Sequence, residues 1–261
     1  MIRILGSCFL IAISSQFLVA QQIQIATYNI NYSNRRLDLV VEAINESAAD
    51  VVVLQETTLK SEEFLRTKLS TIYPHFTSFG HNGAYLAERF AFASKNRLNN
   101  VRFIPPRHGL FGFCCAELQL HGQAIQLINI HLSPVQLSNK SGLGGTLKSL
   151  DSLEQVHQAE LEMIIDHVNL QKPIVLSGDF NSISKSKEQD YLRKLGFIDA
   201  HLSVNPQAEK EHTWQWPTAT LPLLLRLDYV FHSSHLKAIE TKVIRRAGSD
   251  HFLVHSTLEL K

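Results

Sequence analysis

Residues 172–182 read Lys-Pro-Ile-Val-Leu-Ser-Gly-Asp-Phe-Asn-Ser, an apolar run bounded by proline and glycine. Such a run predicts a short strand at 174–177 that is buried on both faces. Asp179 and Asn181 follow where the strand ends, and side chains two residues apart point the same way from extended backbone. A carboxylate beside a neutral amide suits a hard divalent cation together with a phosphate oxygen. Taken alone, the pair has an alternative interpretation, an Asx turn that closes the strand.

The composition indicates a globular chain large enough to bury a core between two packed sheets. The 261 residues are 44% hydrophobic and 19% charged, which is ordinary for a folded protein of this size. The formal net charge is +1, and the charges balance if Arg3 is removed with the N-terminal segment. The protein therefore has no overall basic field, and binding to a polyanion would need a local basic patch.

The first 20 residues have the pattern of a secretory signal peptide. A basic start at Arg3 precedes a mostly apolar run, and Ala20 is followed by two glutamines, which predicts cleavage after Ala20. A membrane anchor fits less well, because polar residues at 14–16 interrupt the apolar run and no basic cluster follows it. We predict a signal peptide at 1–20, a single domain at 21–261, and a secreted or periplasmic protein.

Downstream of this segment, apolar runs of strand length alternate with amphipathic helical patterns. The spacing of apolar residues predicts helices at 37–44, 62–72 and 150–170, and a short helix that ends near Gly196. This order of elements suits a sandwich of two sheets covered by helices. Strands are predicted at 23–28, 51–54, 85–93, 101–104, 113–120, 124–131, 227–232, 239–243 and 252–258.

Polar residues recur where the apolar runs end. A single polar residue at such a place is explained by capping, but six positions in register with strands are not. Strands whose ends meet at one edge of a sandwich would bring these side chains together, so the pattern predicts one shared site. The six positions are Asn29, Glu56, His131, the pair Asp179 and Asn181, Asp228, and the pair Asp250 and His251.

The segments around these residues resemble the successive motifs of the endonuclease/exonuclease/phosphatase superfamily. They occur in the family's order and span nearly the whole chain after residue 20. The resemblance implies an α/β fold, a four-layer sandwich of two mixed β-sheets flanked by helices, and magnesium-dependent cleavage of phosphate esters. The segments are ATYNIN at 26–31, VLQET at 53–57, INIHL at 128–132, LSGDFN at 176–181, RLDYVF at 226–231 and GSDH at 248–251.

The resemblance implies a metal site. Glu56 corresponds to the family's main metal ligand, assisted by Asn29 and Asp250. Oxygen ligands suit Mg²⁺, which keeps several waters and binds substrate phosphate, and Mn²⁺ and Ca²⁺ are the alternatives. A buried glutamate without a counter-ion would be costly. A salt bridge is the other explanation for Glu56.

The resemblance also implies catalytic roles. Asp179 corresponds to the residue that orients or deprotonates the attacking water, and Asn181 to the one that holds a phosphate oxygen. His251 would contact the phosphate, with Asp228 fixing its ring. His131 is similar to the histidine of the deoxyribonuclease and sphingomyelinase branches, where it would act as a general acid or stabilise phosphate charge.

Two further comparisons with deoxyribonucleases concern the substrate. The segment around Glu88 resembles the one whose glutamate pairs with the family histidine, so Glu88 is a candidate partner of His131; a solvated charge beside Arg89 is the alternative. Pancreatic-type deoxyribonucleases insert an Arg and a Tyr into the minor groove, and Thr58 and Leu86 occupy those places here. Duplex DNA is therefore not the expected default substrate.

The sequence predicts a metal-dependent phosphodiesterase and leaves its substrate open. Trp214, Arg35 and Arg36 are candidate substrate contacts, with loop packing and solvated charge as alternatives. A nuclease acting on nucleic acid is favoured. A lipid phosphodiesterase or phosphatase comes next, with membrane lipid meeting the apolar stretch at 221–225. A non-catalytic binding module is third, and no protein partner is implied.

Overall fold

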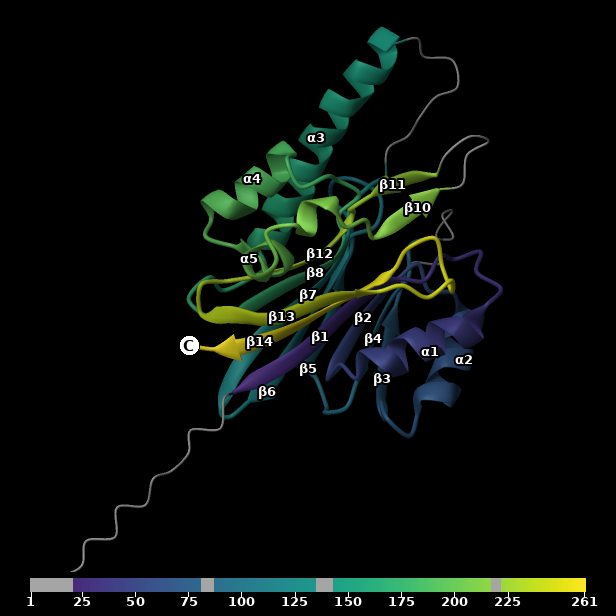
Figure 1. Cartoon of the computed structure of the whole chain (residues 1–261). Coiled ribbons are helices and arrows are strands. Elements are labelled where there is room, and N and C mark those ends of the chain that lie inside the picture. Colours follow the sequence, from purple (N-terminus) through teal and green to yellow (C-terminus); the bar gives the residue numbers. More distant parts are fainter. Residues whose placement is uncertain (1–20, 81–86, 135–142, 217–221) are drawn as a thin grey trace, which may run out of the picture.

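The computed structural model describes residues 21–80, 87–134, 143–216 and 222–261, and only the backbone of residues 143–151. Two six-stranded sheets form the centre of the molecule (Figure 1). Each sheet contains one parallel pair among antiparallel neighbours, so both sheets are mixed. The predicted four-layer α/β sandwich is confirmed.

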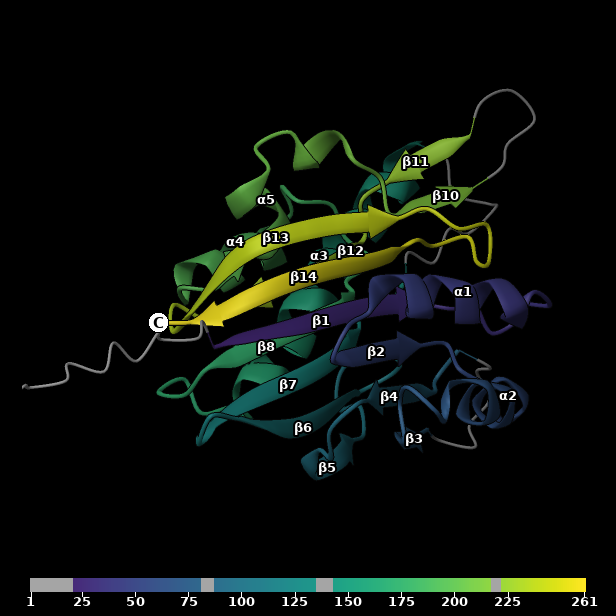
Figure 2. The same cartoon turned by 60° about the horizontal axis from the view of Figure 1, so that its bottom comes forward.

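The first sheet combines the N-terminal strands with the C-terminal hairpin. Its order is β13-β14-β1-β2-β4-β3, which can be followed across the face of the sheet in Figure 2. β1 and β2 run parallel, and both end at the edge that carries the polar residues. The strands are β1 (Gln22–Asn29), β2 (Val51–Gln55), β3 (His75–Phe79), β4 (Phe90–Ser94), β13 (Leu236–Ile244) and β14 (Leu253–Leu260).

The second sheet has the order β5-β6-β7-β8-β12-β9, and its parallel pair is β7 and β8. A separate two-stranded ribbon, β10 (Trp214–Trp216) with β11 (Leu223–Leu225), stands beside the sandwich (Figure 1). The strands of the sheet are β5 (Asn99–Ile104), β6 (Phe113–Leu120), β7 (Gln123–His131), β8 (Ile174–Asp179), β9 (Ile198–Asp199) and β12 (Asp228–His232).

Helices cover the outer faces of both sheets. α1 (Leu37–Ser47) and α2 (Leu59–Leu69) pack on the first sheet, while α3 (Leu143–Ile165) and α4 (Lys187–Lys194) pack on the second. The alternation of side chains along β1 divides the core: Ile23 and Ile25 face the other sheet, whereas Ala26 and Tyr28 face the helices. No helix in the described part of the chain is long and apolar enough to cross a membrane.

The sequence misses some elements and misplaces others. β3, the ribbon of β10 and β11, and the short helix α5 (Ala200–Val204) are not predicted, because they are brief and lack a clear apolar period. α3 begins at Leu143, earlier than the predicted start at 150. The polar edge, in contrast, is where the sequence places it.

Candidate active site

Sheet register places Asp179 at the centre of the polar edge. Asp179 is the last residue of β8 and is completely buried. Across the parallel pair it lies opposite His131, and across the antiparallel pair it lies opposite Asp228. Gly178 makes this close pairing possible, because a Cβ there would overlap the carbonyl oxygen of Ile130 on β7. The GDFN sequence thus fixes the carboxylate between two other strand ends.

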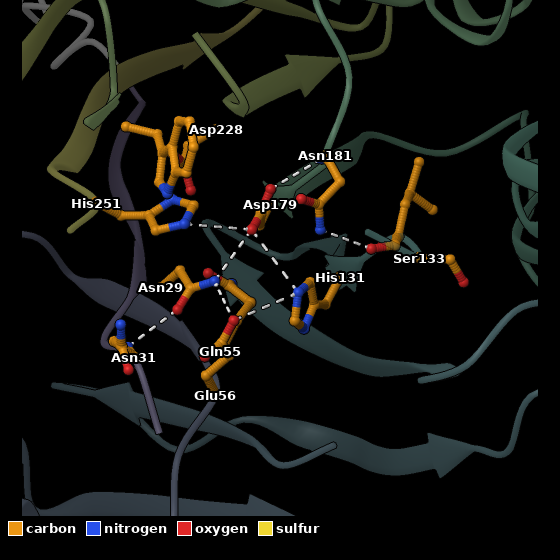
Figure 3. A network of polar contacts seen from close by, with 12 residues as sticks. Asn29, Asn31, Gln55, Glu56, His131, Ser133, Asp179, Asn181, Asp228 and His251 are labelled. Atoms are coloured by element: carbon orange, nitrogen blue, oxygen red, sulfur yellow. Dashed lines mark hydrogen bonds and ion pairs between the residues drawn. The ribbon is translucent and has the colours of Figure 1, made fainter. Parts of the chain in front are cut away.

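His251 forms a buried pair with Asp228, to the left of Asp179 in Figure 3. Nδ1 of His251 lies 2.9 Å from Oδ2 of Asp228, and Nε2 lies 3.6 Å from Oδ2 of Asp179. The carboxylate of Asp228 also accepts a hydrogen bond of 2.6 Å from Oγ1 of Thr213. These contacts fix the imidazole ring so that Nε2 points into the site.

The charges of this pair follow from its burial. Burial alone would lower the pKa of His251, but the neighbouring carboxylates of Asp228 and Asp179 outweigh it and raise the pKa to about 10. The ring is therefore an imidazolium at neutral pH. Burial raises the pKa of Asp179, an effect that His251 opposes and Asp228 reinforces. A proton-accepting carboxylate thus sits beside a fixed positive charge.

The first sheet contributes Asn29 and Glu56 to the same space. Nδ2 of Asn29 donates to Oε1 of Glu56 at 2.9 Å and to Oδ2 of Asp179 at 3.0 Å, so one amide bridges the two sheets. Oε2 of Glu56 accepts from the backbone N–H of Tyr32 at 3.1 Å. Burial raises the pKa of Glu56, opposed by the hydrogen bond from Asn29. Glu56 has a φ of 55°, a strained conformation typical of functional sites.

His131 faces both carboxylates from β7. Its Nε2 lies 3.8 Å from Oε1 of Glu56 and 3.7 Å from Oδ2 of Asp179. The ring stacks on Phe111, with centroids 4.1 Å apart. Burial, helped by the positive charge of His251, lowers the pKa of His131 to about 3. His131 is therefore neutral at pH 7, with Nε2 directed at the site.

Asn181 reaches the site by a route that differs from the sequence prediction. Its φ is 47°, so the prediction that Asp179 and Asn181 project alike from extended backbone is wrong. The N–H of Asn181 donates to Oδ1 of Asp179 at 2.8 Å, which is an Asx turn. Nδ2 of Asn181 donates to the carbonyl of Leu132 at 2.8 Å. The Asx turn is therefore part of the site. Of the two protons on Nδ2 of Asn181, one binds the Leu132 carbonyl and the other stays available.

The donor set fits a divalent cation. Within the described residues, no lysine or arginine forms an ion pair with Glu56, Asp179 or Asp250. Ligand atoms of Asp179, Asp228 and His251 lie within 4.8 Å of one another. A protonated His251 has no lone pair to offer, so the carboxylates of Glu56 and Asp250 are the better donors, and the charge of Asp250 contributes to the raised pKa of Glu56. A cation there would offset their mutual repulsion.

Asp250 and Trp214 lie at the margin of this centre. Asp250 accepts from Nδ2 of Asn31 at 2.8 Å and from Nε1 of Trp214 at 3.1 Å. The Trp214 ring lies 6.3 Å from the ring of His251 and stacks on Trp216, which is 53% exposed. The predicted substrate contact at Trp214 is thus adjacent to the catalytic candidates.

The two arginines predicted to meet substrate differ in their surroundings. Arg36 is exposed and pairs with Asp38, with Nε 3.3 Å from Oδ1. Arg35 lines an open cavity of about 670 Å³ that also includes Tyr32 and Lys60. Because Tyr32 donates to Glu56, this cavity opens beside the carboxylates.

The pairing of Glu88 with His131 stays a prediction. Glu88 is buried, and the nearby residues 81–86, which include Leu86, lie outside the described part of the chain. The described contacts of His131 include Glu56 and Asp179. Thr58 caps α2 through a capping box with Ser61, so its side chain is used for local structure.

Sequence reasoning missed three residues that shape the site. Thr213 bridges Asp228 to the backbone, because its Oγ1 also accepts the N–H of Asp228 at 3.0 Å. Asn31 anchors Asp250, and Phe111 supports the ring of His131. Asn31 lies inside the quoted motif at 26–31, and Thr213 directly precedes Trp214, a predicted substrate contact, so the sequence held a usable signal for both. Phe111 lies in a loop that no periodicity marks.

The chain matches a known protein family over most of its length. The model of the endonuclease/exonuclease/phosphatase family matches residues 26–251, which include every strand end of the site. The chain belongs to this family. Its members are phosphoester hydrolases, so the family accounts for a site of carboxylates, histidines and amides at one sandwich edge. No curated protein matches the chain significantly.

Solved structures share the family fold at low sequence identity. A functionally unknown conserved protein from Enterococcus faecalis V583 matches with a TM-score of 0.71 and 19% identity, covering 92% of this chain and 100% of that one. TDP2 of D. rerio, complexed with a single-stranded DNA product, matches with a TM-score of 0.69 and 17% identity, covering 91% and 98%. TDP2 of C. elegans matches with a TM-score of 0.69 and 16% identity, covering 91% and 75%.

Proposed function

We propose that the protein is a secreted or periplasmic Mg²⁺-dependent phosphodiesterase, and that its substrate is nucleic acid. The observation that carries the proposal is the convergence of Asp179 with Asn29 and Glu56 from the first sheet and with His131 and His251 around one space. A buried carboxylate of raised pKa beside an imidazolium suits a phosphoester hydrolase better than a binding module.

Each residue has a chemical role in this proposal. Asp179 orients the attacking water and accepts its proton, for which a raised pKa is favourable. The imidazolium of His251, held by Asp228, and the remaining amide proton of Asn181 stabilise the charge that develops on the phosphate oxygens. His131 is neutral, so of its two predicted roles we favour hydrogen-bond donation over general-acid catalysis.

The proposed metal ligands are Glu56, Asn29 and Asp250, with Mg²⁺ favoured over Mn²⁺ and Ca²⁺. A bound Mg²⁺ would polarise the phosphoryl oxygens and neutralise charge on the leaving oxygen. Nδ2 of Asn29 donates to Glu56 and Asp179 and so holds both carboxylates in place, which leaves Oδ1 as the atom of Asn29 that would act as a ligand.

Nucleic acid is supported by two observations. The related D. rerio TDP2 structure holds a single-stranded DNA product. In this chain, the exposed Trp216 stacks on Trp214 beside His251, which gives an aromatic surface on which a base can stack.

A lipid phosphodiesterase is the second candidate, and the ribbon of β10 and β11 favours it. Leu223 and Leu224 are 48% and 44% exposed, next to the exposed Trp216. Three exposed apolar side chains on one ribbon suit contact with a lipid surface.

Export is proposed from residues 1–20, and an exported protein whose mass corresponds to a start at Gln21 would support it.

The proposed function is tested by hydrolysis assays on the protein from Gln21 onward. Supercoiled plasmid, single-stranded DNA, RNA, sphingomyelin and a phosphomonoester are incubated in parallel with Mg²⁺ or with chelator. Chelator-sensitive cleavage of nucleic acid, with single strands preferred, is the expected result. Cleavage restricted to sphingomyelin would favour the lipid phosphodiesterase instead. No cleavage of any substrate would contradict the proposed function.

Binding of Mg²⁺ should be visible without turnover. At a Mg²⁺ concentration of about one hundred times Kd, binding adds about 2.7 kcal/mol to the unfolding free energy, or roughly 5–10 °C in Tm. Replacing Glu56 by glutamine should remove most of this shift. The control is Glu46→Gln, at an exposed glutamate that pairs with Arg246. An unchanged shift in Glu56→Gln would argue against Glu56 as a ligand, and thermal scanning fluorimetry provides the measurement.

A further inference from the structure

Ser133 lies directly behind the site, and buried groups bind all of its polar atoms. Its N–H and Oγ–H donate to the two carboxylate oxygens of Glu160, at 3.2 and 2.8 Å. Its Oγ accepts the N–H of Leu110 at 2.9 Å, and its carbonyl lies 2.6 Å from Nε2 of His157. Ser133, Glu160 and His157 are 5%, 4% and 1% exposed. The main chain at this point is therefore held from three sides.

His157 is a buried cation in this arrangement. Nδ1 lies 3.0 Å from Oε1 of Glu188 on α4, while Nε2 faces the carbonyl of Ser133. Both partners are hydrogen-bond acceptors, so both ring nitrogens carry a proton. Burial opposes the charge, but the hydrogen bonds with Glu188 and Ser133 and the charges of Glu188 and Glu160 together outweigh it and raise the pKa of His157. The same pairing lowers the pKa of Glu188. The pair joins α3 to α4 through charge.

Such a network stabilises a core less effectively than apolar side chains do. Burying an ion pair costs several kcal/mol in desolvation, and apolar residues of similar size often serve stability as well or better. Glu160 adds a further buried carboxylate, and burial raises its pKa. The arrangement therefore suggests a function other than stability.

The function we infer follows from the residue that precedes Ser133. Leu132 donates its N–H to the backbone carbonyl of Asp179 at 2.9 Å, and its carbonyl accepts Nδ2 of Asn181 at 2.8 Å. Figure 3 shows Asn181 directed toward this stretch of chain beside Ser133. The carbonyl that orients Asn181 is thus one residue away from the groups that hold Ser133.

We propose that Glu160, His157 and Glu188 are positioning residues, which hold Ser133 so that the Leu132 carbonyl orients the amide of Asn181 toward the phosphate. The inference rests on the proposed function for its catalytic meaning, but the orientation itself is a property of the folded protein.

The first test observes Asn181 without any substrate. In protein labelled with ¹⁵N-asparagine, the side-chain amide signal of Asn181 is identified by its loss in Asn181→Ala. Glu160→Ala should move this signal toward the position of a solvated amide, and Glu160→Gln, which keeps an acceptor for Ser133, should restore it. An unmoved signal in Glu160→Ala would overturn the proposal. If Glu160→Ala does not fold, Ser133→Ala, which loses only the hydroxyl contacts, replaces it.

The second test is a double-mutant cycle in kcat. Glu160→Ala should lower kcat about tenfold with little change in KM, and should lower it no further when Asn181 is already alanine. A merely structural role would give equal losses in both backgrounds and would overturn the proposal. If the wild-type protein hydrolyses nothing, the proposed function fails and the amide signal alone decides the inference.

The control for both tests is Ser47→Ala. Ser47 is also a buried serine with two hydrogen bonds, to the carbonyl of Ile44 and from the N–H of Ala49, but it lies at the far end of α1. This variant should lower Tm without moving the Asn181 signal or kcat. A change in either readout would mean that these readouts report general destabilisation, and the proposal would fall.

Discussion

Replacing Asp179 by asparagine is expected to lower kcat about 10³-fold or more and, at the same time, to raise Tm. The loss of activity follows because asparagine cannot accept the proton of the attacking water, and a positioned base contributes about 10²–10⁴-fold. Single-turnover and steady-state hydrolysis with Mg²⁺ measure the loss.

The gain in stability follows from the pKa of Asp179. Burial raises the folded-state pKa above the usual value of 3.8, so the folded state binds the proton more tightly than the unfolded state. Stability therefore falls as pH rises above about 4, until the folded carboxyl is ionised. Asparagine carries no charge, so in chelator at pH 7 the variant should unfold at a higher temperature than wild type. A lower Tm together with full activity would contradict the role of Asp179 as the buried base of the site.

A matched comparison separates catalysis from packing. Asp199→Asn changes another buried aspartate, one that pairs with Arg226 at 2.7 Å. Removing one partner of a buried ion pair is destabilising, so this variant should lose Tm, the opposite of Asp179→Asn. An increase in Tm for both variants would mean that the effect is not specific to the active-site charge.

The position of the site was predictable because strand ends are local signals. The apolar runs before Asn29, Glu56, His131 and Asp179 mark where four strands finish. The parallel pairs β1 with β2 and β7 with β8 then bring these four ends to the same edge. The pairing of the strands was not predicted, because the family resemblance implied only two mixed sheets flanked by helices.

The details of contact were not predictable, since they depend on packing between distant segments. Phe111 stacks on His131 although 20 residues of chain and a strand separate them. The positive φ of Asn181 is a local feature, yet the GDFN sequence alone allowed either an extended backbone or an Asx turn. The neutral state of His131 depends first on its burial and then on the charge of His251, which lies just before the C-terminal strand β14.

The second large effect is expected for His251→Gln. Loss of the imidazolium removes a charged donor from the phosphate, and one well-placed donor is worth about 10²–10³ in kcat. Asp228 and Asp179 also lose the charge that stabilises them. The variant should therefore be less stable than wild type at neutral pH, as well as nearly inactive.

The pH dependence of this stability difference tests the charge directly. The pKa of His251 is raised from 6.5 to about 10 in the folded state. The stabilisation by the bound proton is therefore complete below pH 6.5, and it is lost as pH rises through about 10. The difference in unfolding free energy between wild type and His251→Gln, from urea titrations at pH 6 to 10, should be largest at pH 6 and shrink steadily.

His255 provides the matched control, because it is another buried histidine whose pKa shifts in the opposite direction. Burial lowers the pKa of His255 to about 4, so this ring is neutral in both folded and unfolded states above about pH 7.5. The difference between wild type and His255→Gln should stay constant from pH 7.5 to 10. A difference that is equally constant for His251→Gln would mean that His251 is not an imidazolium, and the charge stabilisation assigned to it would have to come from another group.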